Sequence, residues 1–120
     1  MLNKGAWDGE RLLDPDVVLQ ATKHTGHPFS FGLAWLTNSD MAGNKLWPSL
    51  PWDAFAARGA GMQILLIIPS LNLIMMRNGA DVDAGPNYEA LYEHYMFWPL
   101  MEAVTNVLPF SWSEKINRVD

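Results

Sequence analysis

The chain has no cysteine, which excludes a disulfide framework and a thiolate metal site. Basic residues are also scarce: Lys and Arg number 8 against 13 Asp and Glu, so the formal net charge is -5. These basic side chains are scattered, whereas nucleic-acid and anionic membrane surfaces need them clustered. The composition therefore argues against nucleic acid and anionic lipid as partners.

A long apolar run is also missing. The longest stretch, residues 63–76, is interrupted by Pro69, Ser70 and Asn72 and falls short of the roughly 20 residues that cross a bilayer. Residues 1–5 place no apolar segment behind a basic start, so they are not expected to form a signal peptide. The sequence predicts no membrane span and leaves the cellular compartment open.

What is present is the composition of a packed domain. The 120 residues are 49% hydrophobic and 18% charged, which fits one domain with a core of moderate size. Asp14 and Pro15 supply an N-cap and a first helical residue for a short helix that ends near Lys23. The expected buried face of this helix consists of Val17, Val18 and Ala21.

Two apolar segments predict the centre of a sheet. Residues 63–68 and 71–77 are rich in Ile and Leu, and Pro69-Ser70 between them makes a turn, which indicates a buried antiparallel hairpin. Residues 31–37 alternate bulky and small side chains as a further strand does. Residues 38–53 contain glycine and prolines and predict an irregular connection.

Residues 88–107 have helical composition, and Pro99 is expected to kink the helix or to begin a second one. An apolar stripe recurs at spacings of three and four residues, formed by Leu91, Tyr95, Trp98, Met101, Val104 and Leu108. Trp98 on this helix and Trp35 on its strand are expected in the core. The predicted fold class is α+β, an antiparallel sheet with a C-terminal helix packed on it.

Three stretches together resemble the last part of the serine beta-lactamase-related family, which includes class C beta-lactamases, DD-peptidases and esterases. They are residues 3–13 (NKGAWDGERLL), residues 31–35 (FGLAW) with Asn38, and residues 55–79 (FAARGAGMQ, then IIPSLNL, ending at RNG). In the third stretch a glycine-rich strand entry, a strand, a Pro-Ser-Leu turn and a second strand follow in the family's order. The resemblance covers residues 2–107.

The resemblance implies that residues 1–120 are a single partial domain, the C-terminal part of a beta-lactamase-like hydrolase domain. It implies a serine hydrolase acting on small-molecule amides or esters, in which the serine of a Ser-x-x-Lys helix attacks a carbonyl. No serine here has a lysine three residues later, and no tyrosine has an asparagine two residues later. We therefore expect no catalytic residue in this chain and predict that it is inactive alone.

Two partners follow from the same resemblance, besides the small-molecule substrate. One is the missing N-terminal portion of the same protein, which would carry the nucleophile upstream of Met1. The other is a second copy of this chain. The family further suggests a location in the cell envelope or outside the cell, and it requires no cofactor.

The family's third motif, Lys-Thr-Gly or His-x-Gly on a strand, aligns with Ala57, Arg58 and Gly59. Ala57 carries neither the ammonium nor the imidazole that supports the serine or binds a substrate carboxylate. Gly59 still permits close approach to a substrate, and the N–H of Ala60 or Gly61 is the candidate oxyanion-hole donor. Whether Arg58 takes over anion binding stays open, because strand alternation aims it away from the face of Ala57.

Trp47 and Trp52 flank Pro48 and Pro51 in the loop ahead of the Gly59 strand, where the rim of a site belongs. For these two tryptophans, a functional role and plain packing both remain open. A second hypothesis takes the chain as a non-catalytic scaffold or binding domain derived from the same fold, with its ligand near them. The alanine at position 57 motivates that hypothesis.

No metal or nucleotide site is predicted. His24 and His27 have a spacing found in zinc sites, but only the remote His94 is left to complete the set, so they are interpreted as solvated loop histidines. The glycine-rich stretch after the third-motif position opens a strand, whereas a phosphate loop opens a helix. Glu89 and Glu93 share a helix face and are interpreted as solvated.

Overall fold

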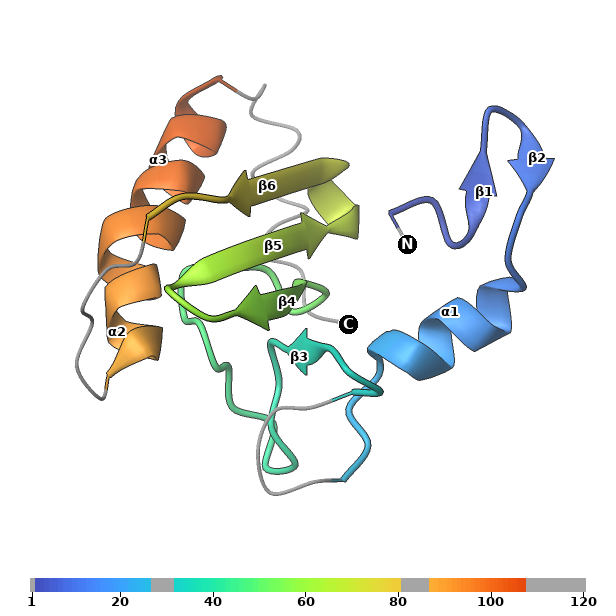
Figure 1. Cartoon of the computed structure of the whole chain (residues 1–120), viewed down its shortest axis with the longest axis horizontal. Helices are drawn as coiled ribbons and strands as arrows, with labels where there is room; N and C mark the ends of the chain where they lie inside the picture. The colour runs from blue at the N-terminus through green and yellow to red at the C-terminus, as the bar shows by residue number, and fades with distance from the viewer. Residues whose placement is uncertain (1, 27–31, 81–86, 108–120) are drawn as a thin grey trace.

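The computed structural model describes residues 2–26, 32–80 and 87–107 of the chain. Its centre is a four-stranded antiparallel sheet in the order β3-β4-β5-β6 (Figure 1). The strands are β3 (Leu36–Thr37), β4 (Phe55–Gly59), β5 (Gln63–Ile68) and β6 (Leu73–Arg77). The predicted hairpin is confirmed, because β5 and β6 pair along their length around the 3-10 turn η1 (Pro69–Leu71).

The strand predicted over residues 31–37 is shorter than expected. Only the two residues of β3 pair with β4, and Phe31 lies outside the described residues. Ala34 has a φ of 64°, and the Gly32 N–H donates to the Trp35 carbonyl, so the chain turns here instead of extending. The edge of β4 beyond residue 56 is thereby left without a described partner strand.

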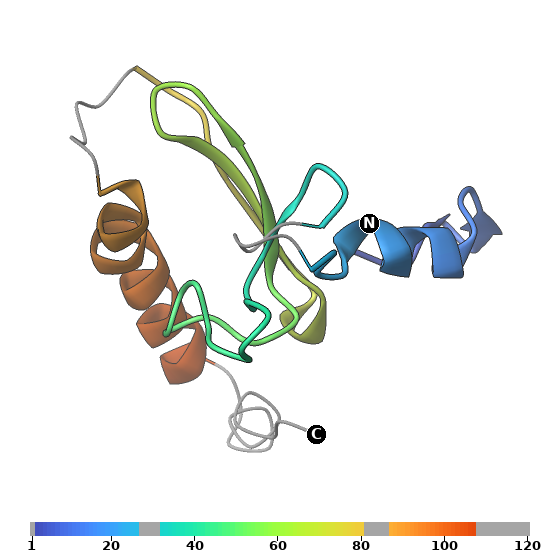
Figure 2. The same cartoon turned by 90° about the horizontal axis from the view of Figure 1, so that it is seen from below.

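A continuous helix covers one face of the sheet (Figure 2). It consists of α2 (Tyr88–Tyr92), a π-helical turn η2 (Glu93–Phe97) and α3 (Trp98–Val107). The π turn ends two residues before Pro99, which has no N–H to donate to the Tyr95 carbonyl and whose ring clashes with that carbonyl in a regular α-helix. The predicted helix with an irregularity at Pro99 is confirmed.

The buried side of this helix differs from the predicted stripe. Tyr95 and Trp98 are 68% and 55% exposed, so placing them in the core was wrong, whereas Tyr92 and Phe97 are fully buried. The π turn is wider than an α turn, so residues five apart share a side here, and the stripe assumed spacings of three and four. Met101 is in the core as expected, and Leu108 lies outside the described residues.

The main core lies between the helix and the sheet. On β5, Ile64, Leu66 and Ile68 alternate with outward residues and are 2%, 0% and 0% exposed. Trp47 packs among them from the loop, edge-on to Phe97 with 5.1 Å between the ring centroids. Burial of this apolar layer is the main stabilising contribution in the fold.

Residues 38–53 form the irregular connection predicted for them, and Asn38 organises it. The Asn38 amide donates to the carbonyls of Trp47, Leu50 and Pro51 at 3.1, 3.2 and 3.0 Å. Its Oδ1 accepts the Trp47 N–H at 2.6 Å. This buried side chain thus satisfies backbone groups that have no strand or helix to pair with.

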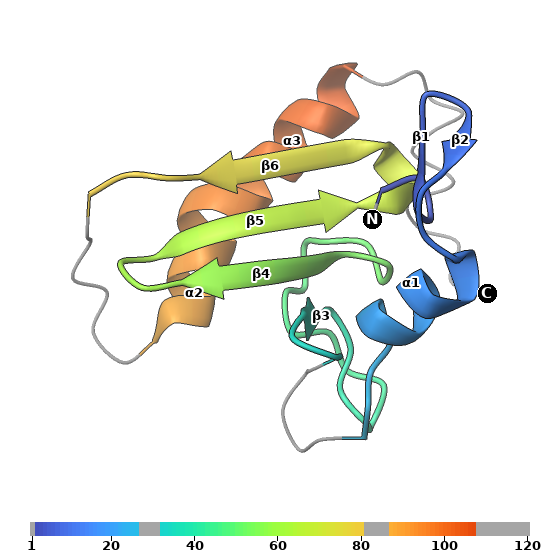
Figure 3. The same ribbon diagram turned by 45° about the vertical axis from the view of Figure 1, so that its right-hand side comes forward.

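The N-terminal part lies on the other side of the sheet from the long helix (Figures 2 and 3). It contains the hairpin β1 (Ala6–Trp7) and β2 (Glu10–Arg11), followed by α1 (Pro15–Thr22). The predicted cap is present, because Asp14 Oδ1 accepts the Asp16 N–H at 2.8 Å.

The buried face predicted for α1 is only partly correct. Val18 is buried and Ala21 is half-buried, but Val17 is 58% exposed. Val17 was wrongly predicted, since Val18 lines the pocket that α1 shares with Asp53 and Pro69 and Val17 does not. Within the described ranges, no helix has the length and apolar character needed to cross a membrane.

Candidate functional site

The face of the sheet opposite the helix is apolar and partly bare. Alternation and register place its side chains in cross-strand rows, one of Phe55, Ile67 and Ile74 and the next of Ala57, Leu65 and Met76. The first row is covered at Phe55 by the edge-on ring of Trp35, whose centroid is 5.2 Å away. The second row is open, and Met76 is 68% exposed.

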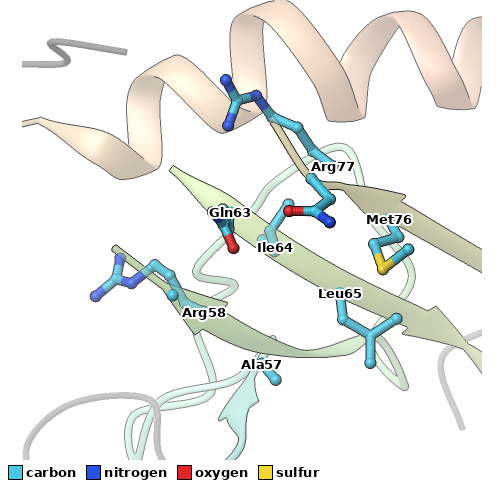
Figure 4. A pocket seen from close by; sticks show the side chains of 9 residues that line it. Ala57, Arg58, Gln63, Ile64, Leu65, Met76 and Arg77 are labelled. Carbon is cyan, nitrogen blue, oxygen red and sulfur yellow. The ribbon is translucent and has the colours of Figure 1, made fainter. Parts of the chain in front are cut away.

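A shallow hollow of about 340 Å³ lies at the end of this face where β4 turns into β5 (Figure 4). Its lining comes from residues 57–59 of β4, 63–65 of β5 and 76–78 at the end of β6. No described residue of the long helix lines it, so the hollow opens on the bare face. In Figure 4, Leu65 and Met76 project away from the helix, whereas Arg77 extends toward it.

Gly59 leaves the backbone uncovered at this hollow. Its φ is not in the left-handed region, and a Cβ there would meet only the Gln63 side chain, at 3.5 Å from Cβ and 3.8 Å from Oε1. The fold therefore does not need a glycine here, although glycine weakens a strand. A bare backbone at this position suits the close approach of a ligand, which is the role predicted for Gly59.

β4 has an open edge beside the hollow. The Asn38 N–H donates to the Ala54 carbonyl at 3.0 Å, and residue 56 pairs with β3, so even-numbered residues of β4 direct their backbone groups toward the β3 side. By the same alternation, the N–H and C=O of Arg58 point to an edge that no described strand occupies. This edge can pair with an extended ligand.

The two candidate oxyanion donors differ in position relative to that edge. Ala60 continues the alternation from Arg58 at the point where the strand enters the turn. Gly61 has a φ of 70° and belongs to the left-handed part of the turn that leads into β5. The geometry therefore favours Ala60, together with Arg58, as the backbone donor at the open edge.

The Arg58 side chain belongs to the helix-covered face, in one row with Ile64 and Arg77. Its guanidinium forms an ion pair with Glu89 of α2, and Glu89 also accepts the Trp47 Nε1–H at 3.1 Å. The Arg58 side chain thus faces the helix, whereas its backbone groups point to the open edge of the strand. Its guanidinium is directed away from a carboxylate that enters the hollow.

The interpretation of Glu89 and Glu93 as solvated residues is wrong. Both are half-buried, and Glu93 Oε1 accepts the Ser49 N–H at 2.8 Å, so the pair ties the helix to the loop. Tyr92 between them is fully buried, and its Oη has no partner among the described residues. Burial raises the pKa of the Tyr92 hydroxyl, and the Arg58 charge opposes that shift.

The expected tryptophan rim is not found at Trp47. Trp47 is fully buried in the core, so its ring offers no surface to a ligand. Trp52 is half-buried, and Lys45 Nζ lies 5.2 Å from its ring centroid in a cation–π contact. Neither tryptophan lines the hollow. A tryptophan flanked by prolines in a loop can pack in the core as well as at a site rim. Trp47 packs in the core.

The histidines do not converge in the part of the chain that the structure describes. His24 Nδ1 accepts the Gly26 N–H at 2.9 Å, and His94 packs edge-on to Tyr95 with 4.6 Å between the ring centroids. His27 lies outside the described residues. Among the described residues, no group of three or more His, Asp or Glu side chains is placed to hold a metal ion.

Sequence analysis missed six residues of the hollow, and four of them, Gln63, Leu65, Met76 and Asn78, belong to the face opposite the helix. Leu65 and Met76 were assigned to a sheet taken as buried, because apolar composition does not say which face a helix will cover. Counting in steps of two from the cross-strand partners of Gly59 and Ala57 would have placed all four on one face.

Comparison with protein-family models, with curated proteins and with solved structures finds no significant match for this chain. The predicted α+β class is confirmed by the antiparallel sheet and the C-terminal helix. The likeness to the beta-lactamase-related family stays a prediction that depends on the three sequence stretches alone.

Proposed function

We propose that the open edge of β4 and the hollow beside it bind the acyl part of an amide or ester, as one wall of an acyl-transfer site of the serine beta-lactamase-related type. The observation that carries the proposal is the bare backbone at Arg58 and Gly59. It is open at the strand edge and also over the face, where Gly59 has no side chain.

The chemistry of such a wall is limited to positioning and charge stabilisation. The backbone N–H of Arg58 or of Ala60 can donate to a substrate carbonyl, and such a donor stabilises the oxyanion that develops when a nucleophile attacks. Acyl transfer also needs an activated nucleophile, and no serine here belongs to a Ser-x-x-Lys pair. The nucleophile therefore comes from another polypeptide segment in this proposal.

Because the nucleophile comes from another segment in this proposal, we predict that the chain alone hydrolyses neither nitrocefin nor p-nitrophenyl acetate above the buffer rate. The reason is that an oxyanion donor without a nucleophile forms no covalent intermediate. Intact mass spectrometry after treatment with a fluorophosphonate or penicillin probe checks it. Stoichiometric acylation of any serine in the chain would contradict this prediction.

A binding experiment tests whether the edge of β4 and the hollow beside it accept a ligand. Titration of the isotope-labelled chain with N-acetylalanine N-methylamide is expected to shift the backbone amide resonances of Arg58, Gly59 and Ala60. Gly59→Val should weaken this binding about tenfold or more, because a branched side chain blocks the approach to the backbone. Gly79→Val is the matched control, since a Cβ at Gly79 meets nothing within 4 Å and the φ there is ordinary. Shifts that avoid β4 would overturn the proposal.

The second candidate is a non-catalytic binding domain that keeps the sheet as a scaffold. The uncharged side chain of Ala57 at the third-motif position favours it, because a hydrolase of this type needs an ammonium or imidazole there. With Trp47 buried, its ligand surface would be the bare face and not the tryptophan loop. A monomer that unfolds cooperatively in urea is its expected behaviour, and aggregation of the isolated chain would count against it.

A further inference from the structure

We propose that the hollow selects uncharged acyl amides or esters and discriminates against ligands that carry a carboxylate. This inference rests on the proposed function, because it concerns what the same wall accepts. It answers in the negative the question that the sequence left open at Arg58, namely whether this arginine binds a substrate anion.

The side chains on the bare side of the hollow carry no charge. Alternation from Gly59 and its partner Gln63 places Ala57, Leu65, Met76 and Asn78 with them on this side. Arg58 and Arg77 contribute to the lining from the intervening row, whose side chains point to the helix. The chain thus offers a ligand here two amides, apolar groups and bare backbone.

Both arginines of the intervening row are already engaged on the covered side. Arg58 is paired with Glu89. Arg77 donates to the carbonyls of Gly61, Met62 and Ala80 at 2.9, 3.1 and 2.9 Å. Moving either guanidinium to the bare face would break these contacts and leave a carboxylate or carbonyls without their donor.

A carboxylate in this hollow therefore loses part of its hydration over Leu65 and Met76 without gaining a cation. A neutral amide or ester loses much less hydration. It can also bond to the side-chain amides of Gln63 and Asn78, for which the described residues provide no hydrogen-bond partner. The difference in solvation selects the neutral ligand.

A matched pair of probes tests the selection on the full chain. N-acetylalanine N-methylamide and N-acetylalaninate differ mainly in the charge of one end, and both are titrated at neutral pH and equal ionic strength. Binding of each probe is followed through the backbone amide resonances of residues 58–60. The carboxylate is expected to bind about tenfold or more weakly than the amide.

Placing a cation in the hollow should reverse part of this preference. Ala57→Lys is expected to lower the amide-to-carboxylate affinity ratio about threefold to tenfold, because the new ammonium can pair with the carboxylate. Gln63→Lys, at an exposed position, is a second variant in case the first does not fold. Ile74→Lys is the matched control, since it adds the same charge on the same face outside the hollow.

The outcomes separate the two proposals. Equal or tighter binding of the carboxylate at these amides in the unaltered chain would overturn the selection while the binding wall stands. An unchanged affinity ratio in both lysine variants would also overturn it. If neither probe shifts these resonances, the proposed function itself fails.

Discussion

The two faces of the central sheet have similar apolar compositions but are covered to different extents. On β5, Ile64, Leu66 and Ile68 face the long helix and are almost fully buried. On the opposite face, Ile67 is buried as well, and Leu65 faces an open hollow. On β6, Ile74 and Met76 are 55% and 68% exposed. An antiparallel sheet with one face in water normally carries polar side chains there. The face opposite the helix departs from that pattern at Ile74 and Met76, which are apolar and exposed.

The largest expected difference between the faces concerns stability. Leu66→Ala should lower the free energy of unfolding by about 2 to 5 kcal/mol, because it removes a fully buried side chain and leaves a cavity. Met76→Ala on the bare face should change it by only about 0.5 kcal/mol or less. Urea denaturation of the two variants measures both values. Equal losses would show that the bare face is covered in solution.

The loop that brings Trp47 to the covered face can be tested separately. Asn38→Ala should cost about 2 to 4 kcal/mol of unfolding free energy, because the Trp47 N–H and three carbonyls lose a buried partner. Asn44→Ala is the control, since Asn44 bonds to Asp40 at an exposed position. A small effect of Asn38→Ala would mean that the core, and not this amide, holds the loop.

A smaller effect is expected from the Tyr92 hydroxyl, one of the buried polar groups of the described residues that have no hydrogen-bond partner. Tyr92→Phe should change the free energy of unfolding at neutral pH by about 1 kcal/mol or less, because the buried hydroxyl makes no hydrogen bond. Thermal unfolding followed by circular dichroism measures the change.

The same substitution should alter the response to alkaline pH. Burial raises the pKa of Tyr92 above its usual value of 10.0, so the unfolded chain releases this proton at lower pH than the folded chain. The contribution to stability is complete below that usual value and is lost as the pH rises through the folded-state pKa. Tyr92→Phe should remove this part of the alkaline loss, and Tyr95→Phe, at an exposed residue, should not.

The smallest effect on stability is expected at the bare face, where association should change instead. Ile74→Lys should alter the free energy of unfolding by about 0.5 kcal/mol or less, yet lower any self-association and dye binding of the chain, because a charge interrupts the exposed apolar surface. Sedimentation velocity with Val17→Lys on α1 as the control checks it. A similar decrease in both variants would place the association elsewhere.

Some of the candidate site was predictable from the sequence. Gly59 and the turn after it were identified by the third-motif alignment, and alternation correctly placed the Arg58 side chain on the face opposite Ala57. Leu65 and Met76 were missed as site residues, because an apolar strand looks the same whether or not a helix covers it. For Trp47, a rim role and plain packing both stayed open at the sequence level, since a loop position gives no information about depth.

The long helix shows the same limit of prediction, here in which of its sides is buried. Composition predicted its extent and the irregularity at Pro99. The face it buries depends on a π turn before that proline, which brings Tyr92 and Phe97 inward and leaves Trp98 exposed. The sum of local preferences does not distinguish this turn from a regular α-helical one, because the choice is made by packing against the sheet.

The sequence by itself determined the α+β class, the β5–β6 hairpin, the capped α1 and the absence of a Ser-x-x-Lys nucleophile. These features depend on neighbouring residues, through turn chemistry, alternation and capping. Only the tertiary structure decided which sheet face is bare, where β3 stops pairing with β4 and which partner occupies Arg58. Those depend on contacts between segments far apart in the chain, where burial and charge pairing choose among arrangements that local sequence leaves equal.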